Sequence, residues 1–586
     1  MDGISRRIDP WLGRPALTAW LLSGVLAGLY GWVRFVGYFR TEALVYSRWL
    51  SGEVVYPAGN PAAVALYETV TPFHGLIGLL SSAGLGDLAI TQLCCAVNVA
   101  VYAQATALMV FALSRNVPAA VLLGIAQAAT TGFLQGTDYP IVIVNNEKLL
   151  GSLGLGLQLQ IFGLIGLGRQ TPALALVAVL TVVHPVFAAF NAALVVAVRV
   201  TNRFGAGQRL WSGGALLGAA MAAWALLRAS RPEVDLPPPA DPRLVEAYFN
   251  LWDAHRNTPL TVYGLITLAE SLAGLGLILL LCRRGGERLR AMTTALAMAG
   301  ALGIACWIGF NTLRPWLPPL LLIPMPNRLM NVSEALVFPV VAGLLLALRP
   351  RVLPRVGLAG LVVVMLGCGV ALDMGEFSLV DPVRLNTMAG TKLALTAVVI
   401  VLAWALATGR VALAEVEEKT DSTSRHPALA AAWLAVGGAV LGIGLSTRSP
   451  DPFAAGQEVF DRLAKSEGVV LGLENINLTK SPIRNAELFS FPCLDVLAYT
   501  PRLIPQVAQI MADVYGGDFF NPPKANYRIG VYNVVDMQAM ARRSTEEWKA
   551  LGAQYGFHFI VTLGGRELAL PKVDMGRIRI FIIPQD

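Results

Sequence analysis

The chain has 586 residues, of which 55% are hydrophobic and only 14% are charged. Soluble domains carry about 25% charged residues, so this composition excludes a soluble enzyme and predicts a polytopic α-helical membrane protein with room for one soluble domain. The net charge is +7, with basic residues clustered in short loops, which is a signal of membrane orientation and not of nucleic-acid binding. The six Cys form no disulfide framework and no CxxC metal site.

The N-terminus has a basic start and an apolar run without a clear small-residue cleavage site, which indicates a retained first helix near 15–33. A long polar loop, 34–87, follows, and we expect one or two of its segments to form helices in the membrane interface. The loop combines carboxylates with many aromatic residues. Such a loop can hold a lipid head group and perform acid–base chemistry there, or it can be a plain amphipathic interfacial segment.

Further membrane helices are predicted wherever about 20 apolar residues occur in a row. These lie near 88–113, 116–134, 149–168, 210–228, 261–282, 291–310, 332–348, 356–373, 391–408 and 427–446. A second polar loop, 136–148, leads into the helix near 149–168.

The apolar run 171–200 is interrupted at its middle by His184-Pro185. Proline ends a helix at the preceding residue, so this run is either one kinked span or a hairpin of two short helices. Positive residues favour the cytoplasmic side in short loops. Only a hairpin places the basic residues of 199–209 on the cytoplasmic side. We therefore interpret the run 171–200 as a hairpin. The chain then has about 13 membrane helices, with the N-terminus in the cytoplasm and the C-terminus outside.

The tail has ordinary soluble composition, which divides the chain into a membrane domain, 1–446, and a C-terminal domain, 447–586. Segments 468–473, 558–563 and 577–584 are typical of strands, and 501–517 and 544–556 are typical of amphipathic helices. Alternating strands and helices predict a small α/β domain, on the periplasmic side by the orientation above. It contains no phosphate-binding Gly-rich loop, nucleophile elbow or His/Cys metal cluster, so we expect a binding or structural module.

With this topology the chain resembles the GT-C glycosyltransferases, polytopic enzymes that use polyprenyl-phosphate-linked sugars on the outer face of the membrane. The motifs are Glu42 in the first outer loop, YFRTEALVYSRWLSG, and Asp138 in the second, GTDYP. The broken helix pair LTVVHPVFAAF and the soluble domain after about a dozen helices complete the likeness. Many members carry an Asp or adjacent acidic residues in the first loop, whereas here a lone Glu stands between Thr41 and Ala43.

The resemblance implies an inverting transferase in a bacterial inner membrane that moves a sugar from a polyprenyl-phosphate donor to a glycan or lipid-linked acceptor, as in polysaccharide or cell-wall biosynthesis. Glu42 is the candidate catalytic base, with Glu53 as the alternative. Glu42 and Asp138 together are candidate ligands of Mg²⁺ or Mn²⁺. The plain alternatives are a surface ion pair for Glu42 and a turn-forming role for Asp138.

The leaving lipid phosphate needs cationic partners at the outer membrane edge. The candidates are Arg328, His184, Lys148 and Arg314, with Arg384 and Lys392 as weaker ones. Lys and Arg in such positions can instead extend to lipid head groups, and His184 can serve backbone groups freed by Pro185.

Two other functions fit the sequence less well. An O-antigen-type polymerase or ligase, acting on diphosphate-linked glycans, would depend on Arg and His in the late loops. A transporter would show interrupted helices at matching positions of two halves, and the sequence has one such break, at His184-Pro185.

Overall fold

The computed structural model describes most of the helical part and much of the tail. The described residues are 14–34, 42–129, 149–202, 211–253, 261–284, 287–324, 329–349, 357, 360, 382–413, 438, 442, 458, 463, 468–473, 483–489, 494, 496–521, 540–563, 567–575 and 578–584. The helices predicted near 356–373 and 427–446, and the domain boundary at 446, lie outside these ranges apart from single positions.

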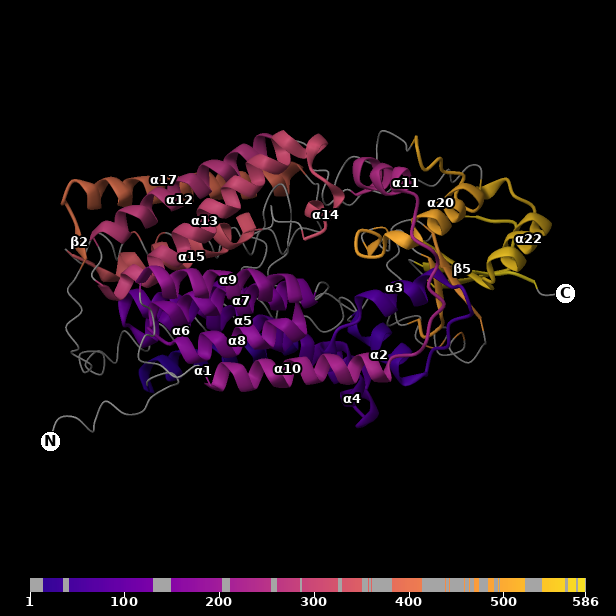
Figure 1. Ribbon diagram of the computed structural model, residues 1–586, viewed down its shortest axis with the longest axis horizontal. Helices are drawn as coiled ribbons and strands as arrows, with labels where there is room; N and C mark the ends of the chain where they lie inside the picture. Colours follow the sequence, from indigo (N-terminus) through magenta and orange to yellow (C-terminus); the bar gives the residue numbers. More distant parts are fainter. Residues whose placement is uncertain are drawn as a thin grey trace.

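Long helices form an elongated bundle, and the C-terminal residues form a separate lobe at one end of it (Figure 1). We call residues 463–584 the C-terminal lobe and the adjoining end of the bundle the lobe end. The bundle helices are α1 (Arg14–Arg34), α5 (Asp87–Ser114), α6 (Val117–Ala129), α7 (Leu149–Gly166), α8 (Gln170–Val183), α9 (Pro185–Asn202), α10 (Trp211–Ser230), α12 (Val262–Arg284), α13 (Glu287–Leu313), α15 (Leu329–Ala347) and α17 (Pro382–Ala407).

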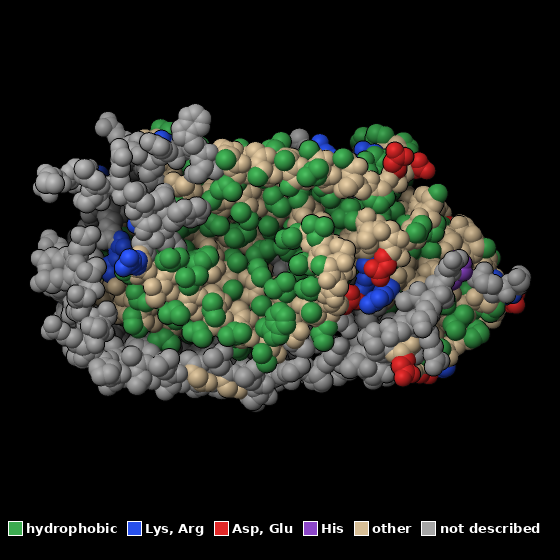
Figure 2. Space-filling model, turned by 90° about the horizontal axis from the view of Figure 1, so that it is seen from below, with side chains coloured by type: hydrophobic (Ala, Val, Ile, Leu, Met, Phe, Trp, Pro, Cys, Tyr) green, Lys and Arg blue, Asp and Glu red, His purple; other side chains and the backbone are tan. Residues whose placement is uncertain are grey.

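Among the described residues, six helices are long and apolar enough to cross a membrane: α1, α5, α12, α13, α15 and α17. A seventh span arises if α3 (Pro61–Thr69) and α4 (Pro72–Ser82), bent by 105°, are counted as one. Hydrophobic side chains cover much of the face of the bundle seen in Figure 2. Leu29 of α1 and Leu226 of α10 are among the large hydrophobic side chains that are exposed. An apolar outer surface of this kind suits a lipid environment. The predicted total of 13 helices stays a prediction.

The break at His184 separates α8 from α9. Pro185 opens α9, the position where its missing N–H costs no hydrogen bond. The two helices pack against each other, and each also contacts α7, so the run 171–200 folds as a hairpin whose turn lies at the lobe end. This is the arrangement that the charge pattern favoured over one kinked span.

Three short helices, more than the one or two expected, follow α1 at the lobe end: α2 (Ala43–Ser51), α3 and α4. Later segments add α11 (Pro242–Ala247), the π-helix η3 (Tyr248–Trp252), the 3-10 helix η4 (Arg314–Trp316) and α14 (Pro319–Leu322) to the same end. At the opposite end, β1 (Leu348–Arg349) and β2 (Ala412–Leu413) form a short antiparallel pair. Among the described residues, most of the short helices that connect the bundle helices therefore lie at the lobe end.

The lobe contains a five-stranded sheet of order β4-β3-β5-β7-β6. β4 (Glu487–Phe489), β3 (Val470–Gly472) and β5 (Phe559–Leu563) are parallel, whereas β7 (Ile578–Ile582) and β6 (Lys572–Met575) continue antiparallel. The helices are η10 (Pro501–Leu503), α20 (Ile504–Asp513) and α22 (Thr545–Tyr555). The three predicted strands and both predicted helices occur, and Ser544 and Glu547 form the expected capping box.

The lobe shares one hydrophobic core with the polar connections of the bundle. Val64 of α3 and Phe249 of η3 are buried in the same cluster as Ile504 and Trp548 of the lobe. The hydroxyl of Tyr248 donates to the carbonyl of Leu494 at 2.7 Å, and the indole N–H of Trp252 donates to that of Phe519 at 2.5 Å. Contacts through a common core fix the lobe relative to the lobe end of the bundle.

Removing the Trp252 donor should loosen this attachment. In Trp252→Phe the buried carbonyl of Phe519 loses its partner, which costs about 1–3 kcal/mol. Limited proteolysis of the detergent-solubilised protein should release the lobe faster. The control is Trp316→Phe, whose ring is 76% exposed and whose change should cost less than about 0.5 kcal/mol. Equal proteolysis of the two variants would contradict this attachment.

Candidate functional site

Glu42 stands at the lobe end, immediately before the first residue of α2. Its backbone carbonyl accepts the N–H of Val45 at 3.0 Å, which starts the helix. The side chain is half-buried and makes no capping hydrogen bond to the helix. The carboxylate is therefore not used to satisfy the amides of α2, although it lies where the helix dipole favours a negative charge.

One turn further along α2, the ring of Tyr46 stacks on the ring of His74 from α4, with centroids 3.9 Å apart. The Tyr46 hydroxyl and the Thr69 hydroxyl are hydrogen-bonded at 2.8 Å. The Nδ1 atom of His74, which is fully buried, accepts the backbone N–H of Thr71 at 2.9 Å. These contacts hold the first turn of α2, which follows Glu42, against α4.

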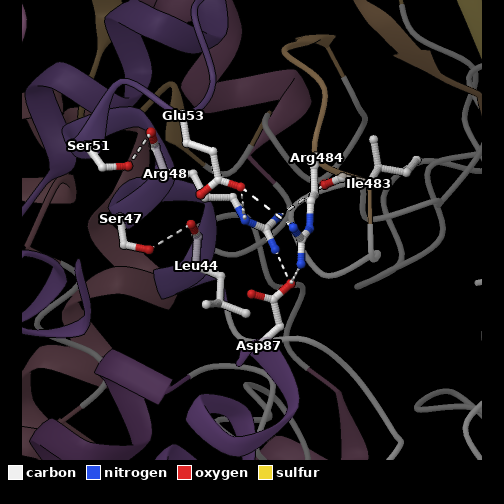
Figure 3. A network of polar contacts seen from close by, with 8 residues as sticks. All are labelled: Leu44, Ser47, Arg48, Ser51, Glu53, Asp87, Ile483 and Arg484. Carbon is white, nitrogen blue, oxygen red and sulfur yellow. Dashed lines mark hydrogen bonds and ion pairs between the residues drawn. The ribbon is translucent and has the colours of Figure 1, made fainter. Parts of the chain in front are cut away.

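A cluster of two arginines and two carboxylates lies at the other end of α2 (Figure 3). Arg48 of α2 is bound to Asp87, the first residue of α5, and its Nε lies 3.8 Å from the Glu53 carboxylate. From the lobe, Arg484 reaches the same two acids, at 3.1 Å from Asp87 and 3.8 Å from Glu53. The arginine Arg48 also donates to the carbonyl of Ile483 at 3.4 Å. The cluster thus joins α2, α5 and the lobe.

The two arginines of this cluster differ in environment. Arg48 is 4% exposed, and burial lowers the pKa of its guanidinium while Asp87 acts in the opposite direction. A guanidinium remains charged even so, and hence Arg48 depends on Asp87 for compensation. Arg484 has a side chain that is 43% exposed and is solvated by water. The acidic and basic side chains that border the lobe in Figure 2 break an otherwise hydrophobic face.

His184 also lies at the lobe end, half-buried at the turn between α8 and α9. Its ring stacks on that of Phe187 at 4.2 Å. Gly154 of α7 packs against both residues, since a Cβ there would lie 2.7 Å from the Phe187 ring and 3.0 Å from the His184 Cβ. The helix that follows the second polar loop therefore meets the His184 turn closely.

The remaining predicted residues are only partly described. Arg314, in η4, donates to the backbone carbonyl of Phe249 and so anchors η4 on η3. Lys392 is 4% exposed and is paired with two glutamates inside the bundle, so it does not extend to lipid head groups. Asp138, Lys148 and Arg328, and the side chain of Arg384, lie outside the described residues.

A divalent metal requires several oxygen ligands. Glu42 offers a carboxylate of the right kind, and the second predicted ligand, Asp138, lies outside the described residues. In the part of the chain that the structure describes, no three His, Cys, Asp or Glu side chains are grouped so as to hold a metal ion. The described residues alone do not build the predicted Mg²⁺ or Mn²⁺ site.

Comparison with known proteins gives a structural likeness. No family model matches the sequence, and no curated protein matches it either. The structure is similar to that of ArnT from Cupriavidus metallidurans bound to undecaprenyl phosphate, with 12% identity, a TM-score of 0.43 and coverage of 96% of this chain and 98% of that chain. The apo structure of ArnT gives 15% identity and the same TM-score, with coverage of 97% and 98%.

Likeness at this level assigns no activity to the chain, and the site has to be argued from its own residues. Sequence reasoning missed two groups of charges, the cluster around Arg48 and the pairing of Lys392. Acidic residues in or beside predicted membrane helices could have indicated both groups, since such charges are usually paired. They are Asp87 at the edge of one apolar run, and Glu270 and Glu334 within two other apolar runs.

Asp87 should be the residue on which the Arg48 cluster depends. Asp87→Asn leaves Arg48 buried with a weakened counter-charge, which we expect to destabilise the protein by about 3 kcal/mol. Arg484→Gln breaks the exposed pair with the same carboxylate and should cost about 0–1 kcal/mol. Thermal unfolding in detergent at matched salt compares the two. A larger loss for Arg484→Gln would show that the exposed pair is the stronger one.

Proposed function

We propose that this protein is an integral-membrane glycosyltransferase that transfers a sugar from a polyprenyl-phosphate donor to a glycan or lipid-linked acceptor, with inversion at the anomeric carbon. The reaction takes place at the lobe end. The observation that carries the proposal is the placement of Glu42, a half-buried carboxylate that does not cap its helix, at the lobe end of a membrane-length bundle.

Glu42 is preferred to Glu53 as the base. The Glu53 carboxylate lies 3.8 Å from nitrogen atoms of both Arg48 and Arg484, within a cluster that joins the lobe to the bundle. These ion pairs give Glu53 a structural role. Glu42 precedes α2, whose next turn is fixed by the Tyr46–His74 stack, and a positioned carboxylate within reach of an acceptor is what general base catalysis needs.

In the proposed reaction the acceptor hydroxyl attacks the anomeric carbon from the face opposite the leaving phosphate. Glu42 takes the hydroxyl proton, the C–O bond to the phosphate breaks, and the polyprenyl phosphate leaves with the bonding electrons. Cationic side chains stabilise that charge. His184 and Arg314 lie at the lobe end, and Arg328 and Lys148 complete the proposed set. In the alternative in which Glu42 is a metal ligand and not the base, Glu42 and Asp138 would hold a Mg²⁺ or Mn²⁺ ion that takes up this charge.

The orientation of the bundle supports a periplasmic site. Basic residues occur where helices end away from the lobe, as at Arg115 after α5, Arg169 before α8, Arg283 in α12 and Arg410 after α17. Positive charge marks the cytoplasmic side. The lobe and Glu42 would then face the periplasm of a bacterial inner membrane, where polyprenyl-linked sugars are used for polysaccharide or cell-wall biosynthesis.

The orientation can be tested by cysteine labelling. In spheroplasts, a membrane-impermeant maleimide should label Glu546→Cys, which is exposed on α22 of the lobe. It should label Arg410→Cys, exposed at the opposite end, only after lysis. Both are made in a chain whose native cysteines are replaced by alanine. The reverse pattern would place the lobe in the cytoplasm.

The activity is tested by transfer from a panel of polyprenyl-phosphate sugars with full-length protein in lipid nanodiscs. Glu42→Gln should lower the transfer rate about 10²–10⁴-fold, the usual contribution of a general base, while donor binding persists. Glu53→Gln, a matched carboxylate in the same loop, should keep most of the activity of a folded protein.

Two results would contradict the proposal. Loss of transfer in Glu53→Gln with full activity in Glu42→Gln would move the base to Glu53. The absence of transfer and of donor binding with every lipid-phosphate sugar, in folded protein, would exclude this donor class. Diphosphate-linked glycans would then test the polymerase alternative.

A further inference from the structure

Three charged side chains are buried together inside the bundle, one from each of three membrane-length helices. Lys392 of α17 lies 3.0 Å from Oε1 of Glu334 in α15 and 3.6 Å from Oε2 of Glu270 in α12. The lysine also donates to the hydroxyl of Thr267 at 3.1 Å. The side chains of the three charged residues are only 3–4% exposed. We call these three residues the buried triad.

The triad lies below the lobe end, within the apolar part of the bundle. Glu270 is eight positions from the start of α12 and Glu334 five from the start of α15, which is about 12 Å and 8 Å along the helix axes. Next to Glu270, Ser271 borders a small hollow whose other lining residues are aliphatic side chains and glycines of α12, α13, α15 and α17. Because the three charged side chains are only 3–4% exposed, bulk water does not solvate them in the way it solvates Arg484.

The charges of the triad do not balance. Among the described residues, the electrostatic partners of Glu270 are Lys392 and Glu334, and those of Lys392 are the two glutamates. The α13 residues beside the same cavity, Leu296, Ala299 and Gly300, carry no charge. Within the described residues, two carboxylates and one ammonium leave one negative charge in a medium where an uncompensated charge is costly. One more positive charge would balance this group.

The triad also contains carboxylate oxygens that could bind a further positive charge. The ammonium of Lys392 donates to the Thr267 hydroxyl and lies 3.0 Å from Glu334 Oε1. Within the described part of the chain, Glu270 Oε2 and Glu334 Oε2 are buried without a hydrogen-bond partner, as is the hydroxyl of Ser271, the next residue along α12. A carboxyl group that gains a proton becomes a donor.

We propose that the buried triad is an intramembrane proton-binding site, in which the two glutamates together hold one proton while Lys392 stays charged. A proton fits better than a metal ion. The ammonium already lies between the two carboxylates, so a metal ion bridging them would lie against a second positive charge. A proton needs only one oxygen, and Glu334 Oε2 provides one. This inference does not depend on the proposed transferase activity.

Proton binding links the stability of the bundle to pH. The proton is held in the packed helices and is held less tightly once they separate in water, so stability falls as pH rises and the proton leaves. The deprotonated triad would carry one unbalanced negative charge between α12, α15 and α17. Among the described residues, the titratable groups that face one another there are the triad members themselves, with the uncharged Thr267 bonded to Lys392.

The test uses full-length protein in nanodiscs, titrated from neutral to alkaline pH. Infrared spectroscopy should show a protonated-carboxyl C=O band that disappears on alkalinisation, with a parallel fall in the thermal midpoint. Glu270→Gln leaves one glutamate paired with one lysine, so no additional proton is needed. This variant should lack both the protonated-carboxyl band and the fall in thermal midpoint. Glu246→Gln, which changes an exposed glutamate of α11, should behave as the unchanged protein.

The infrared titration of the unchanged protein tests the proposal even if the variants do not fold. A folded protein without the carboxyl band at neutral pH would overturn it. So would a band and a midpoint that respond to pH equally in the unchanged protein and in folded Glu270→Gln. A rise of the midpoint with sodium or lithium at fixed pH, lost in Glu270→Gln, would show a metal-cation site instead.

Discussion

A membrane interior tolerates a charged side chain only where it is paired or reaches the surface, and this constraint organises the described structure. Basic residues such as Arg115 and Arg410 lie beyond the helix ends opposite the lobe. Two sets of buried charges are grouped. Arg48 is compensated by Asp87, and Lys392 by Glu334 and Glu270. Because each group joins segments that are distant in sequence, pairing also determines which helices lie together.

The shared core of the lobe and the lobe-end helices gives the candidate site its rigidity. A lobe attached only by a flexible linker would leave α2 free to move with the loop that contains it. Here α2 is held at its start by the Tyr46–His74 stack and near its end by Arg48. A short helix of nine residues is marginal in isolation, so the position of Glu42 depends on these tertiary contacts more than on helix propensity.

Most helices could be predicted from the sequence because length and apolarity are local properties. α1 and α5 agree with prediction to within a residue or two, and the capping box of Ser544 is present. Strands β4 and β6, of three and four residues, are too short to show a periodicity. The partners of Arg48 and Lys392 were beyond prediction for a different reason: Arg484 is more than 400 positions from Arg48, and no local pattern records such a contact. The same long-range contact pairs Glu53 with Arg484.

The buried triad and the lobe end are mechanically connected through the helices that carry them. α12 and α15 both begin at the lobe end, and each carries its glutamate within the first third or so of its length. A change of charge that pushes Glu270 and Glu334 apart would therefore act close to the starts of both helices. Packed helices respond to such strain by small shifts as units. In the sequence α15 follows 325–328, which contains the proposed phosphate ligand Arg328, so a shift of α15 would act on the segment of chain that contains this residue.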